Sequence, residues 1–271
     1  MRSNSLACVL VTVLFATAAR TAPDSEINHA PSKRDWAQLA RLPDWSGTWT
    51  AAPEDSVFPI GRNEPSWTEA AARQIEQLKA ADAAGTPRNV YINCLPEGMP
   101  SFMLMTLNAF EVLFTPGRVM FLGEVDANRL RRIYTDGRPH PADPDLTFNG
   151  HSIGRWERDT LVVDTVGLLP QVYLPLAQAV ALPNNGDMHI VERIRLVAPD
   201  KLKDELEITA PRVLQTPWKI SRSFVRSRER RYDIVEASCR QGDFTQTRDD
   251  QGNAIFVPID HEEGGAPQPD R

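Results

Sequence analysis

From Phe102 onward, this 271-residue chain is a succession of short strand-like segments joined by tight turns, with almost no helical periodicity between them. The clearest unit is a hairpin in which segments 151–157 and 160–166 flank the turn dipeptide Arg158-Asp159. Consecutive strands joined by short turns favour an antiparallel meander. Further strands are expected at 111–114, 119–125, 131–135, 188–197, 202–209, 218–226 and 231–239.

About eight to ten such strands must hide their edges, and closure into a barrel does so most completely. The first strand is expected to begin near Gly47-x-Trp49, a short motif that resembles the opening of lipocalin-like barrels. One helix is expected over 67–84, capped by Ser66 or Thr68. The sequence therefore predicts an all-β fold: an antiparallel meander that closes into a lipocalin-like barrel over residues 42–248, with one N-terminal accessory helix.

The first eighteen residues have the pattern of a cleavable signal peptide. Arg2 supplies a positive start, segment 6–15 is apolar, and Ala16-Thr-Ala18 is a small-x-small cleavage site. The apolar run is shorter than the roughly 20 residues that a membrane-spanning helix needs. We therefore expect export to the periplasm or beyond, with no membrane insertion of the mature chain. Residues 19–41 are expected to be mobile, and the acidic tail 249–271 to pack loosely.

The net charge limits the classes of partner that the protein can bind, and the cysteine content indicates the redox state of its thiols. The net charge of −6 argues against a nucleic-acid partner and against a basic membrane-binding face. Once Cys8 has left with the leader, Cys94 and Cys239 remain, and in an oxidising compartment they are expected to form one disulfide. Two separately buried thiols are the alternative. The sequence predicts no cofactor and indicates no oligomeric state.

Two longer motifs resemble a family of exported, β-rich bacterial proteins. They are the stretch from Arg132 to Pro141 (RIYTDGRPHP) and the stretch from Gly150 to Thr165 (GHSIGRWERDTLVVDT). The resemblance implies a β-rich fold and export, and it implies no activity. Members of that family often carry glycine where this chain has Arg158, so the hairpin turn here is expected to be less favourable.

The segment Gly150-His-Ser152-Ile-Gly154 matches the G-x-S-x-G pattern of serine hydrolases, with Asp164 and His189 following in the expected order. That nucleophile elbow needs a buried strand before the serine and a helix after it. Here a loop-like segment precedes the motif and a hairpin follows. We therefore expect the glycines to be points of close approach in a strand.

Three histidines, His140, His151 and His189, lie among the polar motifs, with Asp136 nearby. Neutral imidazoles on barrel strands can bind a divalent metal ion. However, no two of these histidines have the spacing of a chelating pair. Histidines that orient loops are the commoner case, so no metal site is predicted.

Strand alternation places acidic residues on apolar faces. Glu192 shares a face with Ile190, Ile194 and Leu196, and Asp164 lies between Val162 and Val166. If these faces are interior, the carboxylates are either paired with a strand arginine such as Arg132 or Arg155, or they have raised pKa values suited to proton transfer.

These observations favour an exported barrel that binds a small, mostly apolar molecule, with lyase, isomerase or hydratase chemistry as an option. A metal-dependent or serine hydrolase and a structural envelope protein without ligand are the alternatives. For the chemistry, the candidate catalytic residues are Glu192, Asp164, Tyr134 and His189. The candidate ligand-binding residues are Arg132, Asp136, His140, His151 and Trp156.

Overall fold

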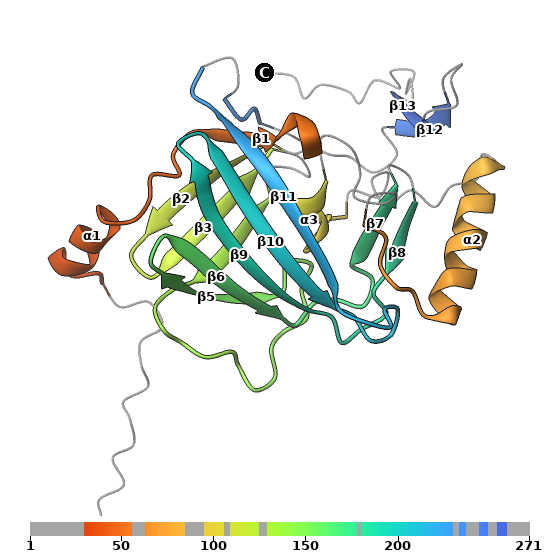
Figure 1. The fold of residues 1–271 in the computed structure, drawn as a ribbon, viewed down its shortest axis with the longest axis horizontal. Coiled ribbons are helices and arrows are strands. Elements are labelled where there is room, and N and C mark those ends of the chain that lie inside the picture. The colour runs from red at the N-terminus through yellow and green to blue at the C-terminus, as the bar shows by residue number, and fades with distance from the viewer. Residues whose placement is uncertain are drawn as a thin grey trace, which may run out of the picture.

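The computed structural model describes residues 30–55, 63–84, 95–105, 109–124, 129–177, 180–229, 233–236, 244–248 and 254–258. Within these ranges, nine strands form a closed barrel in the order β1-β11-β10-β9-β6-β5-β4-β3-β2 (Figure 1). The predicted all-β barrel is therefore confirmed. The barrel strands are β1 (Thr48–Ala51), β2 (Phe110–Thr115), β3 (Arg118–Gly123), β4 (Leu130–Tyr134), β5 (His151–Glu157), β6 (Thr160–Val166), β9 (His189–Ala198), β10 (Lys201–Thr209) and β11 (Trp218–Ser227).

Helices lie at opposite ends of the barrel (Figure 1). The predicted accessory helix is α2 (Glu69–Ala83), whose first turn is capped by the Thr68 hydroxyl accepting from the Ala71 backbone N–H. Its apolar face buries Ala71 and Ile75. Three further short helical segments were not predicted: α1 (Lys33–Leu39), the 3-10 turn η1 (Pro53–Asp55) and α3 (Ser101–Leu104).

The barrel departs from a simple meander in two places. Strands β4 and β5 run parallel, because a long connection carries the chain back to the same end before β5 begins. Between β6 and β9 the chain leaves the barrel to form a separate hairpin of β7 (Tyr173–Ala177) and β8 (Val180–Pro183). This hairpin lies beside α2 (Figure 1). Another two-stranded sheet pairs β12 (Phe244–Arg248) with β13 (Ala254–Pro258).

The predicted hairpin of β5 and β6 is present, and its turn has the expected defect. Arg158 adopts a left-handed backbone conformation with φ of 57°. A side chain at such a position is strained by about 1–2 kcal/mol, whereas glycine adopts it freely. The arginine therefore weakens the turn, as its comparison with glycine predicted.

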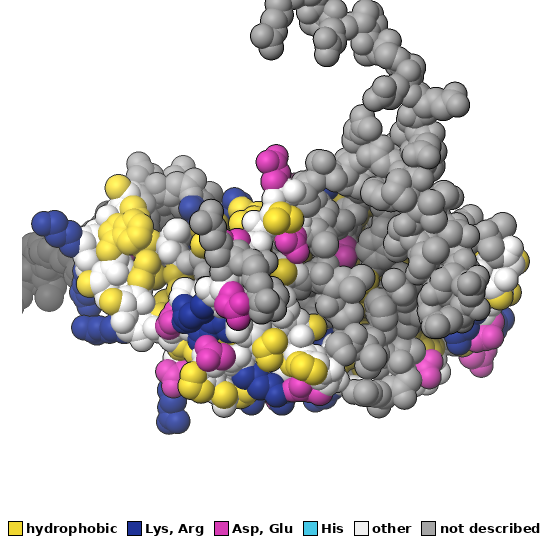
Figure 2. Space-filling model, turned by 90° about the horizontal axis from the view of Figure 1, so that it is seen from above, with side chains coloured by type: hydrophobic (Ala, Val, Ile, Leu, Met, Phe, Trp, Pro, Cys, Tyr) yellow, Lys and Arg dark blue, Asp and Glu magenta, His cyan; other side chains and the backbone are white. Residues whose placement is uncertain are grey.

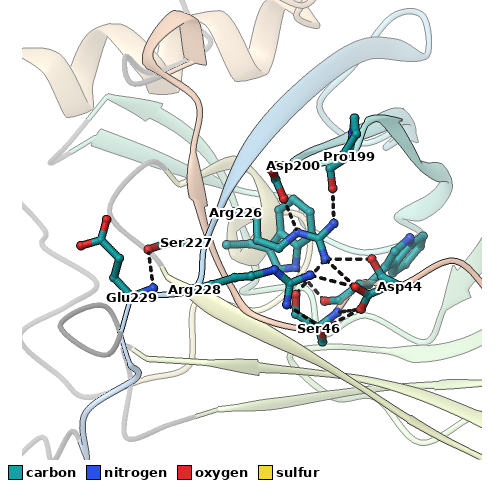
Figure 3. Close-up of polar contacts among 10 residues, drawn as sticks. Asp44, Ser46, Pro199, Asp200, Arg226, Ser227, Arg228 and Glu229 are labelled. Atoms are coloured by element: carbon teal, nitrogen blue, oxygen red, sulfur yellow. Dashed lines mark hydrogen bonds and ion pairs between the residues drawn. The ribbon is translucent and has the colours of Figure 1, made fainter.

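The barrel is closed by the pairing of β1 with β11, and the side chain of Arg226 on β11 reaches the segment just before β1 (Figure 3). Its guanidinium donates to the backbone oxygens of Asp44 (2.9 Å) and Ser46 (3.0 Å), and it lies 4.7 Å from the centre of the Trp49 ring. A side chain at Gly47 would press on Arg226, since its Cβ would come within 3.1 Å of Cδ. The Gly47-x-Trp49 motif thus makes room for the arginine that joins the first and last barrel strands.

Charged side chains of both signs are interspersed on the face shown in Figure 2, and apolar side chains gather at the end of the molecule where α1 lies. No helix in the described ranges is long and apolar enough to cross a membrane. The predicted leader at residues 1–18, Cys94 and Cys239 lie outside the described residues, so the signal peptide, its cleavage and the disulfide remain predictions.

Candidate functional site

The interior of the barrel contains the acid that strand alternation predicted. Glu192 on β9 is fully buried between Ile190 and Ile194, so its predicted orientation is confirmed. Its partner is Arg131 on β4, rather than Arg132 or Arg155. The guanidinium and carboxylate meet in a bidentate contact, with Nη1 2.8 Å from Oε1 and Nη2 bonded to Oε2. Glu192 is therefore an ion-paired carboxylate, with both of its oxygens bonded to Arg131.

A second interior acid was missed by the sequence analysis. Asp204 on β10 is fully buried on the same inward face as Leu202 and Leu206. Burial raises the pKa of Asp204 well above its ordinary value, and the neighbouring Glu192 carboxylate raises it further, while Arg131 opposes both effects. No described group donates a hydrogen bond to either oxygen. The alternation that identified Glu192 would also have identified Asp204.

The described part of the interior is filled by large side chains. Phe110 lies at the centre of an aromatic group, with its ring 4.9 Å from that of Phe224, 5.5 Å from Phe121 and 6.4 Å from Phe102. All four side chains are buried. A barrel of this size has an interior that side chains can fill or that holds one small ligand. In the part of the chain that the structure describes, these rings and the Arg131–Glu192 pair occupy the interior.

The G-x-S-x-G segment has the strand conformation that was expected. Ser152 is 1% exposed on β5, and its hydroxyl lies 2.8 Å from the Thr165 hydroxyl inside the barrel. A side chain at Gly154 would meet Ile133 at 2.8 Å, and one at Gly150 would meet the Val166 backbone oxygen at 2.5 Å. The glycines therefore permit close packing, and Ser152 is neither on an elbow nor open to a substrate.

The expectation that Asp164 points into the barrel is wrong. Its neighbours Val163 and Thr165 are fully buried and face inward, so Asp164 lies on the outer face with its side chain 38% exposed. The prediction took the apolar Val162 as a sign that its face points inward. Val162 is indeed buried, but it lies on the outer face with Asp164.

On this outer face, the structure brings the three predicted histidines together around Asp164. We call His140, His151, Asp164 and His189 the histidine cluster. Asp164 Oδ1 lies 3.1 Å from His140 Nε2 and 2.9 Å from His189 Nε2. His140 Nδ1 in turn lies 2.8 Å from His151 Nδ1. The cluster joins the starts of β5 and β9, the middle of β6 and the loop after β4.

Further predicted residues surround His151. Tyr134 stacks on its ring, with centroids 5.3 Å apart and planes inclined by 25°. Arg138 lies over Tyr134, 4.0 Å from the ring centre. Its guanidinium is paired with the carboxylate of Asp136. Burial lowers the pKa of His151, and the positive charges of His140 and Arg138 lower it further. His151 is thereby favoured in its neutral form.

Metal binding is not supported by this arrangement. Among the described residues, no group of three or more His, Cys, Asp or Glu side chains is placed to hold a metal ion. Both Nε2 atoms in the cluster are directed at the same carboxylate oxygen. These contacts have the geometry of hydrogen bonds.

A cleft of about 710 Å³ lies between α1 and the end of the barrel. We call it the α1 cleft. The predicted residue Trp156 forms part of its barrel wall and packs against Trp45, with ring centres 5.3 Å apart. Asp136 also lines it, whereas Arg132 is exposed on β4 and belongs to neither the cleft nor the cluster. The main apolar lining residues are Trp36, Leu39, Leu42, Pro116, Met120 and Trp156.

Trp36 is the feature of the cleft that the sequence analysis did not identify. It lies on α1, whose side chains are all at least partly exposed, and it is itself 53% exposed. A capping box between Ser32 and Asp35 fixes the start of this helix. That Ser-x-x-Asp spacing was the available sequence signal.

In comparisons with known proteins, no family model and no curated protein matches this chain.

Proposed function

We propose that this protein binds a small, mostly apolar molecule in the α1 cleft. The observation that carries the proposal is a concave, largely apolar volume of about 710 Å³ at the end of a barrel whose described interior is packed. Sites for small molecules usually measure about 300–1,000 Å³ and combine apolar walls with a few polar groups. Arg118, Thr135 and Asp136 supply polar groups in its lining.

The two walls of the cleft differ in how tightly their side chains pack against the rest of the protein. The barrel wall contains Trp156, which packs against Trp45 and Phe114 in an aromatic group. The opposite wall is α1, which buries no side chain completely and presents Trp36 with more than half of its surface in solvent. A bound apolar molecule would cover this surface, and removing apolar area from water stabilises such a complex.

The leader at residues 1–18 supports export, so the proposal places this binding outside the cytoplasm. In that compartment a barrel with a ligand cleft would serve as a carrier or as a scaffold for a reaction. Binding alone, without chemistry, is sufficient for the proposed function.

The test uses the neutral apolar dye N-phenyl-1-naphthylamine and the purified protein. Dye fluorescence should rise on binding, and Trp36→Ala should weaken binding by about tenfold, as expected for losing one large apolar contact of about 1.4 kcal/mol. Leu146→Ala is the matched control, because Leu146 is 55% exposed and lies outside the α1 cleft. Equal affinity in both variants, or no binding by the unmodified protein, would contradict the proposal.

A further inference from the structure

The histidine cluster contains a continuous chain of hydrogen-bonding atoms that ligand binding in the α1 cleft does not explain. The chain runs from His151 through His140 to Asp164, with successive contacts of 2.8 Å and 3.1 Å. Four segments of the barrel supply its members and their neighbour His189. The side chains are 20% exposed at His140, 38% at Asp164 and 42% at His189, and His151 is half-buried, so the cluster is in contact with solvent.

The chemistry of Asp164 determines which ring nitrogens carry protons. A carboxylate oxygen accepts hydrogen bonds, so His140 and His189 must both donate to Oδ1 through Nε2–H. Neutral His140 then has an unprotonated Nδ1. Because the His151 Nδ1 atom is 2.8 Å away, it must be the donor in that contact. Neutral His151 consequently has its lone pair on Nε2.

We infer that His151, His140 and Asp164 form a proton relay in which His151 Nε2 is the general base of a catalytic site. A proton that binds to His151 Nε2 makes this ring cationic. The Nδ1–H bond of His151 can then break as a new N–H bond forms at His140 Nδ1. The positive charge passes to His140, where it lies beside the Asp164 carboxylate.

The surroundings of His151 favour this direction of transfer. Tyr134 stacks on the His151 ring, and Arg138 lies over the Tyr134 ring. A proton on His151 would therefore place a second positive charge near the Arg138 guanidinium. Burial lowers the pKa of His151, and the electrostatic effects of His140 and Arg138 lower it further. The charged and titratable groups facing the relay are Tyr134, Arg138, Asp164 and His189. The carboxylate of Asp136 is paired with Arg138, and Asp164 is the anion that contacts the relay directly, at His140 rather than at His151.

The reaction class that suits this arrangement is water addition to an activated acyl group, such as an ester of a small molecule. His151 Nε2 would take a proton from water as the water oxygen bonds to the acyl carbon. The bond from that carbon to the leaving oxygen then breaks, and the relay returns the proton to the leaving group. The products are a carboxylic acid and an alcohol, and the protein is regenerated. His140 and Asp164 are positioning residues in this scheme.

Nitrogen-15 NMR of the histidine rings tests the relay without any ligand. His151 should be the Nδ1–H tautomer at neutral pH, and His140 and His189 should be Nε2–H tautomers. A His151 ring with its proton on Nε2 would overturn the relay. In Asp164→Asn, which removes the anion, His140 should lose part of its preference for Nε2–H. An unchanged tautomer balance there would assign Asp164 a merely structural role.

Hydrolysis of p-nitrophenyl acetate tests the catalytic step. His151→Gln should lower the rate by about tenfold or more, at the lower edge of the effect of a general base. Glu157→Gln is the matched control, because Glu157 also lies on β5 but pairs with Arg155 and Arg193, outside the histidine cluster. It should change the rate less than about twofold. Equal losses in the two variants, or no loss in either, would overturn the assignment. Dye binding in the α1 cleft is measured separately, so the two proposals can fail independently.

Discussion

The guanidinium of Arg131 and the carboxylate of Glu192 form a bidentate ion pair that is completely buried inside the barrel, with both side chains 0% exposed. The pair connects β4 to β9, two strands that are not neighbours in the barrel. Each side chain of the pair depends on the other, because a buried charge is tolerated only when it is paired.

Glu192→Gln should therefore destabilise the protein strongly. The substitution leaves the Arg131 cation buried without its counter-charge, which typically costs about 3–5 kcal/mol. Denaturant unfolding of the variant measures this loss. Glu157→Gln is the control, because Glu157 pairs with Arg155 and Arg193 on the exposed outer face and its loss should have little effect. A Glu192→Gln variant as stable as the control would show that the pair is not structural.

Asp204 should make stability decrease as pH rises. Its pKa in the folded chain is raised above the ordinary value of 3.8, mainly by burial, so the folded state holds a proton that the unfolded state releases above about pH 4. From there to the folded-state pKa, the free energy of unfolding should fall by about 1.4 kcal/mol per pH unit from this group. Asp204→Asn removes the effect. Its stability relative to the unmodified protein should rise as the pH increases above about 4, and a constant difference would contradict the account.

Asp44 should have the opposite effect to Asp204 on the pH dependence of stability. Hydrogen bonds from the Ser46 hydroxyl and backbone N–H lower its pKa from 3.8 to about 2, and Arg228 and Arg226 add to the effect (Figure 3). Its stabilisation is therefore present above pH 4 and is lost as pH falls towards 2. Thermal unfolding of Asp44→Asn should show a lower midpoint at pH 5 and no difference near pH 2. The gain should be modest, because the side chain is 64% exposed. Asp143→Asn, at an exposed position, provides the control.

Arg158→Gly should stabilise the β5–β6 hairpin. Arg158 has a φ of 57°, which glycine adopts without steric cost, so the gain should reach up to about 1 kcal/mol in denaturant unfolding. Asp159→Gly is the matched control, since its φ is not positive and glycine there only adds freedom to the unfolded chain. A stabilising effect of Asp159→Gly that equals that of Arg158→Gly would indicate another cause.

Local patterns were sufficient for much of the barrel and for one of its interior acids. Alternation placed Glu192 among buried isoleucines, because one face of β9 is consistently apolar. The same rule failed at Asp164, since Val162 on its face is also apolar and buried. Strand β6 therefore has no purely polar face by which its orientation could be recognised.

The remaining features depend on contacts between distant parts of the chain. His140, His151 and His189 have no chelating spacing. His151 and His189 lie near Asp164 because β5, β6 and β9 are adjacent and in register, and the connection after β4 brings His140 to them. The parallel pairing of β4 with β5 follows a long connection whose path no turn motif specifies. Helix α1 has seven residues and buries no side chain, so it carries no apolar periodicity to detect.

The central claim, that a small apolar molecule binds in the α1 cleft, is tested most directly by the indole N–H signals of the tryptophans during titration with N-phenyl-1-naphthylamine. The signals of Trp36 and Trp156, which line the cleft, should shift and saturate together. Those of Trp49 and Trp218, which are buried elsewhere in the barrel, should stay in place. Saturable shifts of Trp49 with unchanged Trp36 would place the ligand inside the barrel and contradict the account.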